Sequence, residues 1–186
     1  ELVHAFNRAA GEARAVLFTG EGKGFNSGAN LADAETMIGD PDRDVGHLLD
    51  RYFNPVLSRM KQMDQPVVTA VRGAAAGVGA GLAMAGDIVV CGETGFFLQA
   101  FCHVGLVPDG GSSWLLTRAV GRVRAMELML LGDRLPGPKA LEWGLVNFVV
   151  PDDEVEAKGM ELAARLAQGP RSLGLIKRVA WAAADA

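Results

Sequence analysis

The sequence predicts an α/β fold, and three observations support this prediction. Short β-branched runs alternate along the chain with stretches in which apolar residues recur at helical spacing. The runs that end near Gly20 and Gly73 lead into glycine-rich segments, which is typical of strand-to-helix turns. No shift in composition and no Ser/Pro-rich linker interrupts the alternation. We therefore expect a single α/β domain over residues 1–186.

The first half of the chain contains clear helix and strand signals. Apolar positions from Val45 to Met60 follow the helical template, and Pro55 predicts that this helix kinks or restarts there. The expected elements are a helix at 2–10, a strand at 15–18, a helix at 45–60, a strand at 67–71 and a small-residue helix at 82–85.

The second half continues the alternation. The segment Asp109-Gly-Gly-Ser-Ser is typical of a helix start, and Gly169-Pro170 is typical of a helix end. The expected elements are strands at 87–91, 96–98 and 145–150, a helix after residue 112, helices flanking Gly121 and Gly132, a helix at 155–166 and a last helix that reaches the end of the chain.

Composition and charge argue against several classes of protein. With 49% hydrophobic and 22% charged residues, the chain does not match disordered or fibrous proteins, and its length suffices for a core. The net charge of −4 has the wrong sign for a protein that binds nucleic acid through its phosphates. The longest uncharged stretch, residues 73–86, is shorter than the roughly 20 apolar residues of a membrane helix. We expect neither nucleic acid nor a membrane as a partner.

The two cysteines and the first residues bear on location. Cys91 and Cys102 match neither a disulfide framework nor a zinc-ligand pattern, which predicts a cytoplasmic protein without a metal site. The opening Glu-Leu-Val-His shows no signal-peptide pattern and starts as if already inside a helix. We therefore expect the sequence to be a fragment of a longer chain.

The glycine-rich segments do not fit the common nucleotide-binding motifs. The spacings that start at Gly20, Gly77 and Gly79 all fail the G-x-G-x-x-G pattern, and Lys23 does not stand in a P-loop. No G-x-S-x-G elbow occurs either. The segments still offer unpaired backbone N–H groups at two strand ends, and the second set begins a helix. Such groups can hold an oxyanion.

Three stretches resemble the crotonase, or enoyl-CoA hydratase/isomerase, superfamily. They are AVLFTGEGKGFNSGANL at residues 15–31, PVVTAVRGAAAGVGAGLAMAGD at 66–87 and ALEWGLV at 140–146. With the helix between Gly121 and Leu131, the resemblance covers nearly the whole chain. It implies a crotonase-like spiral of ββα turns with flanking helices, without the opening strand and the C-terminal oligomerisation helices that members normally carry.

The resemblance also implies a ligand and an assembly. The ligand is an acyl-CoA thioester, with coenzyme A as part of the substrate and no further cofactor required. The assembly is a homotrimer or a dimer of trimers. In the family, the C-terminal helices pack on neighbouring subunits, and these helices are not visible in this sequence.

By motif position, the resemblance assigns the site. The amides of Ala29 and Val78 form an oxyanion hole, and residues of both loops and the following segment contact the CoA thioester. The expected contact residues are Ser27, Ala29, Asn30, Leu31, Val78, Gly79, Phe101 and Gly110. The competing interpretation of both loops is ordinary glycine turn chemistry.

The departures from the family pattern favour isomerisation. The two glutamates that hydratases of this family use fall here on Gly81 and Phe101, and neither residue can move a proton. The remaining acid in this region is Asp109, within the Pro-Asp-x-Gly pattern that resembles the ring-epoxide and enoyl-CoA isomerase branch. We expect Asp109 to act as acid and base on an enolate that the oxyanion hole stabilises. An apolar pocket would raise the pKa of Asp109, whereas a helix N-terminus would lower it.

Several alternatives remain open at this point. Asp109 is also a good helix N-cap. The aromatic residues Phe101, Phe96, Phe97 and Trp114 suit either an acyl pocket or plain core packing. His103 is expected to be structural, and Lys23, Arg72 and Lys177 are expected to be solvated rather than to bind the CoA phosphates.

Three other functions compete with isomerisation. One is 2-enoyl-CoA hydration with Asp109 alone activating water, and another is nucleophilic attack by Asp109 on an aryl-CoA ring, as in the family's dehalogenases. The last is a non-catalytic acyl-CoA-binding scaffold, which the loss of both hydratase glutamates suggests.

Overall fold

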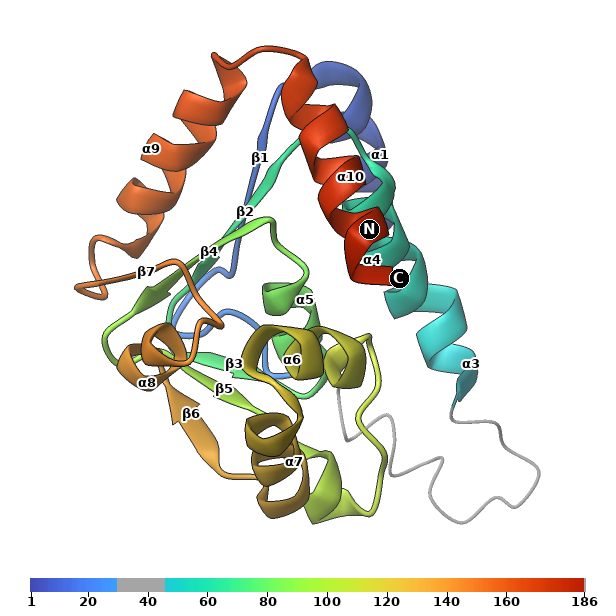
Figure 1. The fold of residues 1–186 in the computed structure, drawn as a ribbon, viewed down its shortest axis with the longest axis vertical. Coiled ribbons are helices and arrows are strands. Elements are labelled where there is room, and N and C mark those ends of the chain that lie inside the picture. Colours follow the sequence, from blue (N-terminus) through green and yellow to red (C-terminus); the bar gives the residue numbers. More distant parts are fainter. Residues whose placement is uncertain (30–45, 186) are drawn as a thin grey trace.

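The computed structural model describes residues 1–29 and 46–185 and contains two sheets (Figure 1). The four-stranded sheet has the order β1 (Val16–Thr19), β2 (Val67–Val71), β4 (Ile88–Gly92), β7 (Phe148–Val150), with all neighbours parallel. The three-stranded sheet has the order β3 (Ala74–Ala76), β5 (Phe96–Leu98), β6 (Arg134–Pro136), in which β5 and β6 are antiparallel.

The chain passes from one sheet to the other in successive turns of a spiral. After β2 it enters β3 and then α5 (Val78–Met84), and after β4 it enters β5 and then the 3₁₀ helix η2 (Ala100–Val104). Asn26, which follows β1, forms a parallel bridge with Ala75 and so begins the second layer in the same way. This arrangement confirms the predicted α/β spiral of ββα turns.

Eight further helices and a π-helix complete the described part of the chain. They are α1 (Leu2–Glu12), α3 (Gly46–Leu48), the π-helix η1 (Leu49–Phe53), α4 (Asn54–Gln62), α6 (Ser112–Val120), α7 (Arg122–Leu131), α8 (Gly137–Glu142), α9 (Val155–Ala167) and, last, α10 (Ser172–Asp185). Pro55 lies in the first turn of α4, so the predicted restart is confirmed. None of the helices in the described residues is long and apolar enough to cross a membrane.

The core explains why β2 reads as a continuous apolar run. Every residue of β2 is buried, because α9 covers one face of its sheet and the second sheet with α5 covers the other (Figure 1). Val68 and Ala70 pack toward α9, whereas Val67 and Val71 belong to the larger core. This strand therefore fixes the position from which the chain enters β3 and α5.

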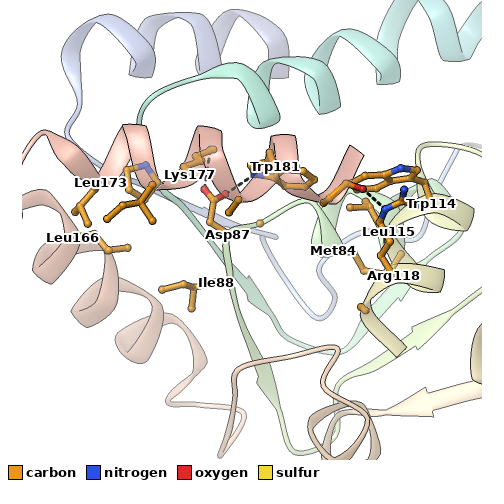
Figure 2. A pocket seen from close by; sticks show the side chains of 16 residues that line it. Met84, Asp87, Ile88, Trp114, Leu115, Arg118, Leu166, Leu173, Lys177 and Trp181 are labelled. Atoms are coloured by element: carbon orange, nitrogen blue, oxygen red, sulfur yellow. Dashed lines mark hydrogen bonds and ion pairs between the residues drawn. The ribbon is translucent and has the colours of Figure 1, made fainter. Parts of the chain in front are cut away.

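Helix α10 lies beside α4 and borders a cavity of about 500 Å³ (Figures 1 and 2). Trp181 of α10 stacks on Trp114 of α6, with ring centroids 5.7 Å apart and planes 15° apart. Lys61 and Arg118 place their cationic groups 5.2 and 4.3 Å from the Trp114 ring centroid. These contacts join α10 to α4 and α6.

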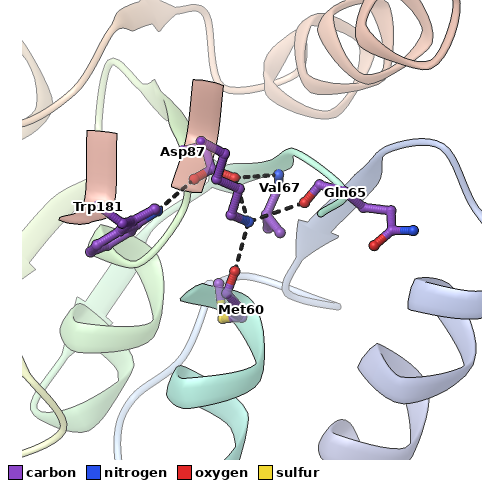
Figure 3. Close-up of polar contacts among 6 residues, drawn as sticks. Met60, Gln65, Val67, Asp87 and Trp181 are labelled. Atoms are coloured by element: carbon purple, nitrogen blue, oxygen red, sulfur yellow. Dashed lines mark hydrogen bonds and ion pairs between the residues drawn. The ribbon is translucent and has the colours of Figure 1, made fainter. Parts of the chain in front are cut away.

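Lys177 anchors α10 from inside the protein (Figure 3). Its Nζ donates to the carbonyl oxygens of Met60 (2.6 Å) and Gln65 (3.0 Å) and lies 2.8 Å from Oδ2 of Asp87. Asp87 also accepts hydrogen bonds from the indole N–H of Trp181 and the amide of Val67. The side chain of Lys177 is 3% exposed, so the expectation that it is solvated is wrong. Burial lowers the pKa of Lys177, and Asp87 opposes that shift.

Replacement of Lys177 should destabilise the fold strongly. Lys177→Met leaves the carboxylate of Asp87 without its buried partner, and such a change costs about 3–5 kcal/mol of unfolding free energy. Denaturant unfolding measures the effect. Lys139→Met, at the exposed pair with Glu142, is the control and should change stability by less than about 0.5 kcal/mol. Adding Asp87→Asn to Lys177→Met should recover part of the loss, and no recovery would contradict the ion-pair explanation.

Candidate active site

Two separate loops pack closely against α5, which is buried along its whole length. A Cβ atom on Gly79 would lie 2.5 Å from the carbonyl oxygen of Asn26, which belongs to the loop after β1. A Cβ atom on Gly81 would lie within 3.0 Å of the carbonyl oxygen of Gly110, a distance that real Cβ atoms do not show. Only glycine permits both approaches, so α5 brings the two loops together.

The predicted oxyanion-hole amides follow two glycines that are in contact. A Cβ atom on Gly77 would lie 3.9 Å from the Cα of Gly28, and Val78 and Ala29 are the next residues along the chain. Val78 is the first residue of α5, where a helix offers its amides no internal acceptor. Within residues 1–29 and 46–185, neither amide has a hydrogen-bond partner. No described residue therefore occupies either amide, and a ligand can accept a hydrogen bond from each.

Asp109 stands on the turn at residues 109–112, which connects to α6 and is called the Asp109 turn below. Its carbonyl oxygen accepts the amide of Ser112 at 2.9 Å, but its carboxyl does not cap the helix, because Gly111 occupies the N-cap position without a side-chain bond. The capping interpretation is therefore wrong. Its Oδ1 is buried and has no partner among the described residues.

The structure gives the direction in which the pKa of Asp109 is shifted. Burial raises the pKa of the Asp109 carboxyl, and a hydrogen bond from its own backbone amide opposes that shift. Desolvation is the larger effect. A carboxyl whose pKa is raised in this way holds its proton more strongly and is a better base when ionised.

The other predicted contact residues fall into three groups. Phe101 is buried and its Cζ would lie 4.0 Å from a Cβ on Gly77, and Gly110 packs on the side chain of Val78. Phe101, Val78, Gly79 and Gly110 are thus brought together. Ser27 and Ala29 are exposed at the end of the first described segment. Asn30 and Leu31 lie outside the described residues.

The remaining aromatic and histidine candidates have contacts elsewhere. Phe97 is buried in the main core, and the guanidinium of Arg134 lies 4.4 Å from the ring centroid of Phe96. Trp114 lines the cavity beside α10, which contains none of the predicted catalytic residues. His103 Nε2 lies 2.9 Å from the carbonyl oxygen of Gly132, in line with a structural role. Only Phe101 of the four aromatic residues lies at the candidate site.

The residue pattern did not reveal the burial of Ser112 or the close packing at Gly81. Ser112 is fully buried, its hydroxyl has no partner among the described residues, and it would lie 3.1 Å from a Cβ on Gly81. The residue pattern showed only a helix start, because a buried hydroxyl has no signature in the sequence. The described residues contain no cluster of three or more His, Cys, Asp or Glu suited to a metal ion.

Comparison with known proteins identifies the family. A family model described as Enoyl-CoA hydratase/isomerase matches residues 1–185. The chain belongs to this family. It is 43% identical over 166 residues to the 1,2-epoxyphenylacetyl-CoA isomerase of Escherichia coli K12, a match that covers 89% of this chain. The chain spans 63% of the length of that relative.

Solved structures of family members share the fold. The chain superposes on an enoyl-CoA hydratase from Mycobacterium avium subsp. paratuberculosis K-10 with a TM-score of 0.84 and 39% identity, covering 98% of this chain and 72% of that one. A monofunctional enoyl CoA isomerase from M. smegmatis gives a TM-score of 0.81 and 32% identity, covering 100% of this chain and 79% of that one. The crotonase fold therefore occurs in relatives named for either reaction.

The raised pKa of Asp109 predicts a pH-dependent stability difference. In the folded protein, the Asp109 carboxyl binds its proton more tightly than in the unfolded chain. The free energy of unfolding of the wild type therefore falls as the pH rises above 3.8 and through the raised pKa. Asp109→Asn removes that loss. Urea unfolding from about pH 3 to neutral pH should show the variant gaining stability over the wild type as the pH rises. A difference that stays constant over this range would contradict the burial of the carboxyl.

Proposed function

We propose that this family member isomerises a CoA thioester, moving the double bond of an enoyl group or rearranging a ring epoxide, with Asp109 as the single acid and base. One observation supports the proposal above all. Oδ1 of the Asp109 carboxyl is buried and has no partner among the described residues, and it lies on a turn that packs against α5. A carboxyl in such a place is suited to proton transfer rather than to structure.

The proposed reaction uses the amides of Ala29 and Val78 and the carboxylate of Asp109. The thioester oxygen of a 3-enoyl-CoA accepts hydrogen bonds from the amides of Ala29 and Val78. Asp109 removes a proton from the carbon next to the carbonyl, and the negative charge of the resulting dienolate develops on the thioester oxygen. Each preorganised donor contributes about 3 kcal/mol to stabilising that charge. The protonated Asp109 then returns the proton to the γ carbon, which yields the conjugated isomer.

The residues at the two positions of the hydratase glutamates argue for isomerisation over hydration. Syn addition of water needs one group to deprotonate water and another to protonate carbon. The positions that carry the two glutamates in hydratases are Gly81 and Phe101 here, and the space beside Gly81 is filled by Gly110 and Ser112. The names of the Escherichia coli relative and the M. smegmatis structural neighbour add support for isomerisation.

The proposal extends to cofactors and assembly. The chemistry needs only the coenzyme A that forms part of the substrate, and no step requires a metal or a redox group. We further propose the homotrimer or dimer of trimers that the resemblance implies.

Removing the carboxylate should abolish most of the isomerase activity. Asp109→Asn keeps the size of the side chain but cannot accept the proton, so turnover of a 3-enoyl-CoA should fall by about 10²–10⁴-fold. The formation of the conjugated thioester, followed by ultraviolet absorbance, measures the effect. Turnover within a few-fold of the wild type would remove Asp109 from the mechanism.

The same preparation distinguishes the rival functions. Formation of 3-hydroxyacyl-CoA from crotonyl-CoA at a rate comparable to isomerisation would favour a hydratase. A scaffold would bind acyl-CoA in calorimetry without converting any enoyl substrate.

The proposed oxyanion hole can be tested at one of its amides. Val78→Pro removes the N–H, and proline is tolerated at the first position of a helix. Loss of one such donor should lower kcat by about 10²–10³-fold. Val78→Ala, which keeps the amide, is the control for the side chain. Equal kcat values for the two variants would contradict the assignment of this amide.

A further inference from the structure

Gly81 occupies an unfavourable position for a glycine unless something requires it. It lies inside α5, where glycine costs about 1 kcal/mol relative to alanine. Its backbone is not in the left-handed region, so an alanine would suit the local conformation. What excludes a side chain is the Asp109 turn, because a Cβ atom would collide with the carbonyl oxygen of Gly110 and would lie 3.1 Å from Ser112 Oγ.

The Asp109 turn has a second close contact with α5. Gly110 has a φ of +55°, and a Cβ atom there would lie 2.6 Å from Cγ2 of Val78. Val78 and Gly81 are three residues apart and therefore share a face of the helix. Gly110 therefore contacts this face of α5 at two points, and Asp109 is the residue directly before Gly110.

We propose that Gly81 is a positioning residue for Asp109, because the lack of a side chain at residue 81 lets the Asp109 turn pack directly on α5 and keeps Oδ1 of the carboxyl buried at the site. This inference rests on the proposed function, in which Asp109 is the acid and base. Gly81 itself touches no reacting atom and acts only through the turn.

The pKa of the Asp109 carboxyl reports whether the Asp109 turn is packed against α5. Helix α5 carries no titratable side chain. On η2, His103 is bonded to the carbonyl oxygen of Gly132, and on α6 the guanidinium of Arg118 donates to the carbonyl oxygen of Ala184. Burial, not a neighbouring charge, is what raises the pKa of Asp109. If the turn moves outward into water, this pKa should therefore fall toward the ordinary value for aspartate.

The first experiment compares two glycines that both lie in helices. Gly81→Ala should lower the pKa of Asp109, measured by ¹³C NMR titration of the carboxyl carbons, with Asp109→Asn used to assign the signal. It should also lower kcat for the 3-enoyl-CoA about 10²-fold, since a displacement of about 1 Å has that effect. Gly11→Ala is the matched control, because nothing lies within 4 Å of a Cβ there, and it should change neither quantity.

The second experiment loosens the same contact from the other side. Gly110→Ala places a methyl group against Val78 and should lower the Asp109 pKa and kcat in the same direction as Gly81→Ala. Gly105→Ala is its control, because Gly105 also has a positive φ (+70°) but open space beside it. The control separates the effect of backbone strain at a positive φ from the effect of losing the contact between the Asp109 turn and α5.

The possible outcomes decide between a positioning role and a purely structural role for Gly81. A folded Gly81→Ala protein with unchanged Asp109 pKa and kcat would overturn the proposal. Failure of both test variants to fold while both controls fold would also overturn it, since the contact would then maintain the fold rather than the carboxyl. If Asp109→Asn retains activity, the proposed function fails, but the NMR titration still decides whether Gly81 holds Asp109 in place.

Discussion

The close approach of backbone to α5 is the constraint on which the candidate site depends. The helix is buried from Val78 to Met84, and two of its residues are glycines that face other loops. Gly79 meets the segment after β1, and Gly81 meets the Asp109 turn. A protein interior is packed too densely to absorb an added methyl group at such places. The site is therefore formed where the backbones of α5, the segment after β1 and the Asp109 turn come into contact.

This construction has a cost that suits a catalytic site. Oδ1 of Asp109 and the hydroxyl of Ser112 are buried without a partner among the described residues, and such groups lower stability. The rest of the domain supplies the compensation, through the apolar core around β2 and the buried pair of Lys177 with Asp87. Both of these unpartnered groups lie on the Asp109 turn. The groups that stabilise the fold are thus different from the groups of the candidate site.

Residue patterns predicted the parts of the structure that depend on local preference. The β-branched run at Val67–Val71, the restart at Pro55 and the alternation of strands and helices were all readable. The strands β3 and β6 were not, because Ala-Ala-Ala and Arg-Leu-Pro have little intrinsic strand preference and are extended by their neighbours. The burial of Lys177 and the free carboxyl of Asp109 depend on distant segments, so no local pattern could reveal them.

The anchoring of α10 also has a consequence for synthesis of the protein. The carbonyl oxygens of Met60 and Gln65 and the carboxylate of Asp87 meet their cation only when Lys177 is in place, 117 positions after Met60. Ribosomes add roughly 5–20 residues per second, so the nascent chain exists for several seconds with these groups unmatched. We expect the sheet to form before α10 emerges, and these three acceptors to remain open to water until α10 packs beside α4.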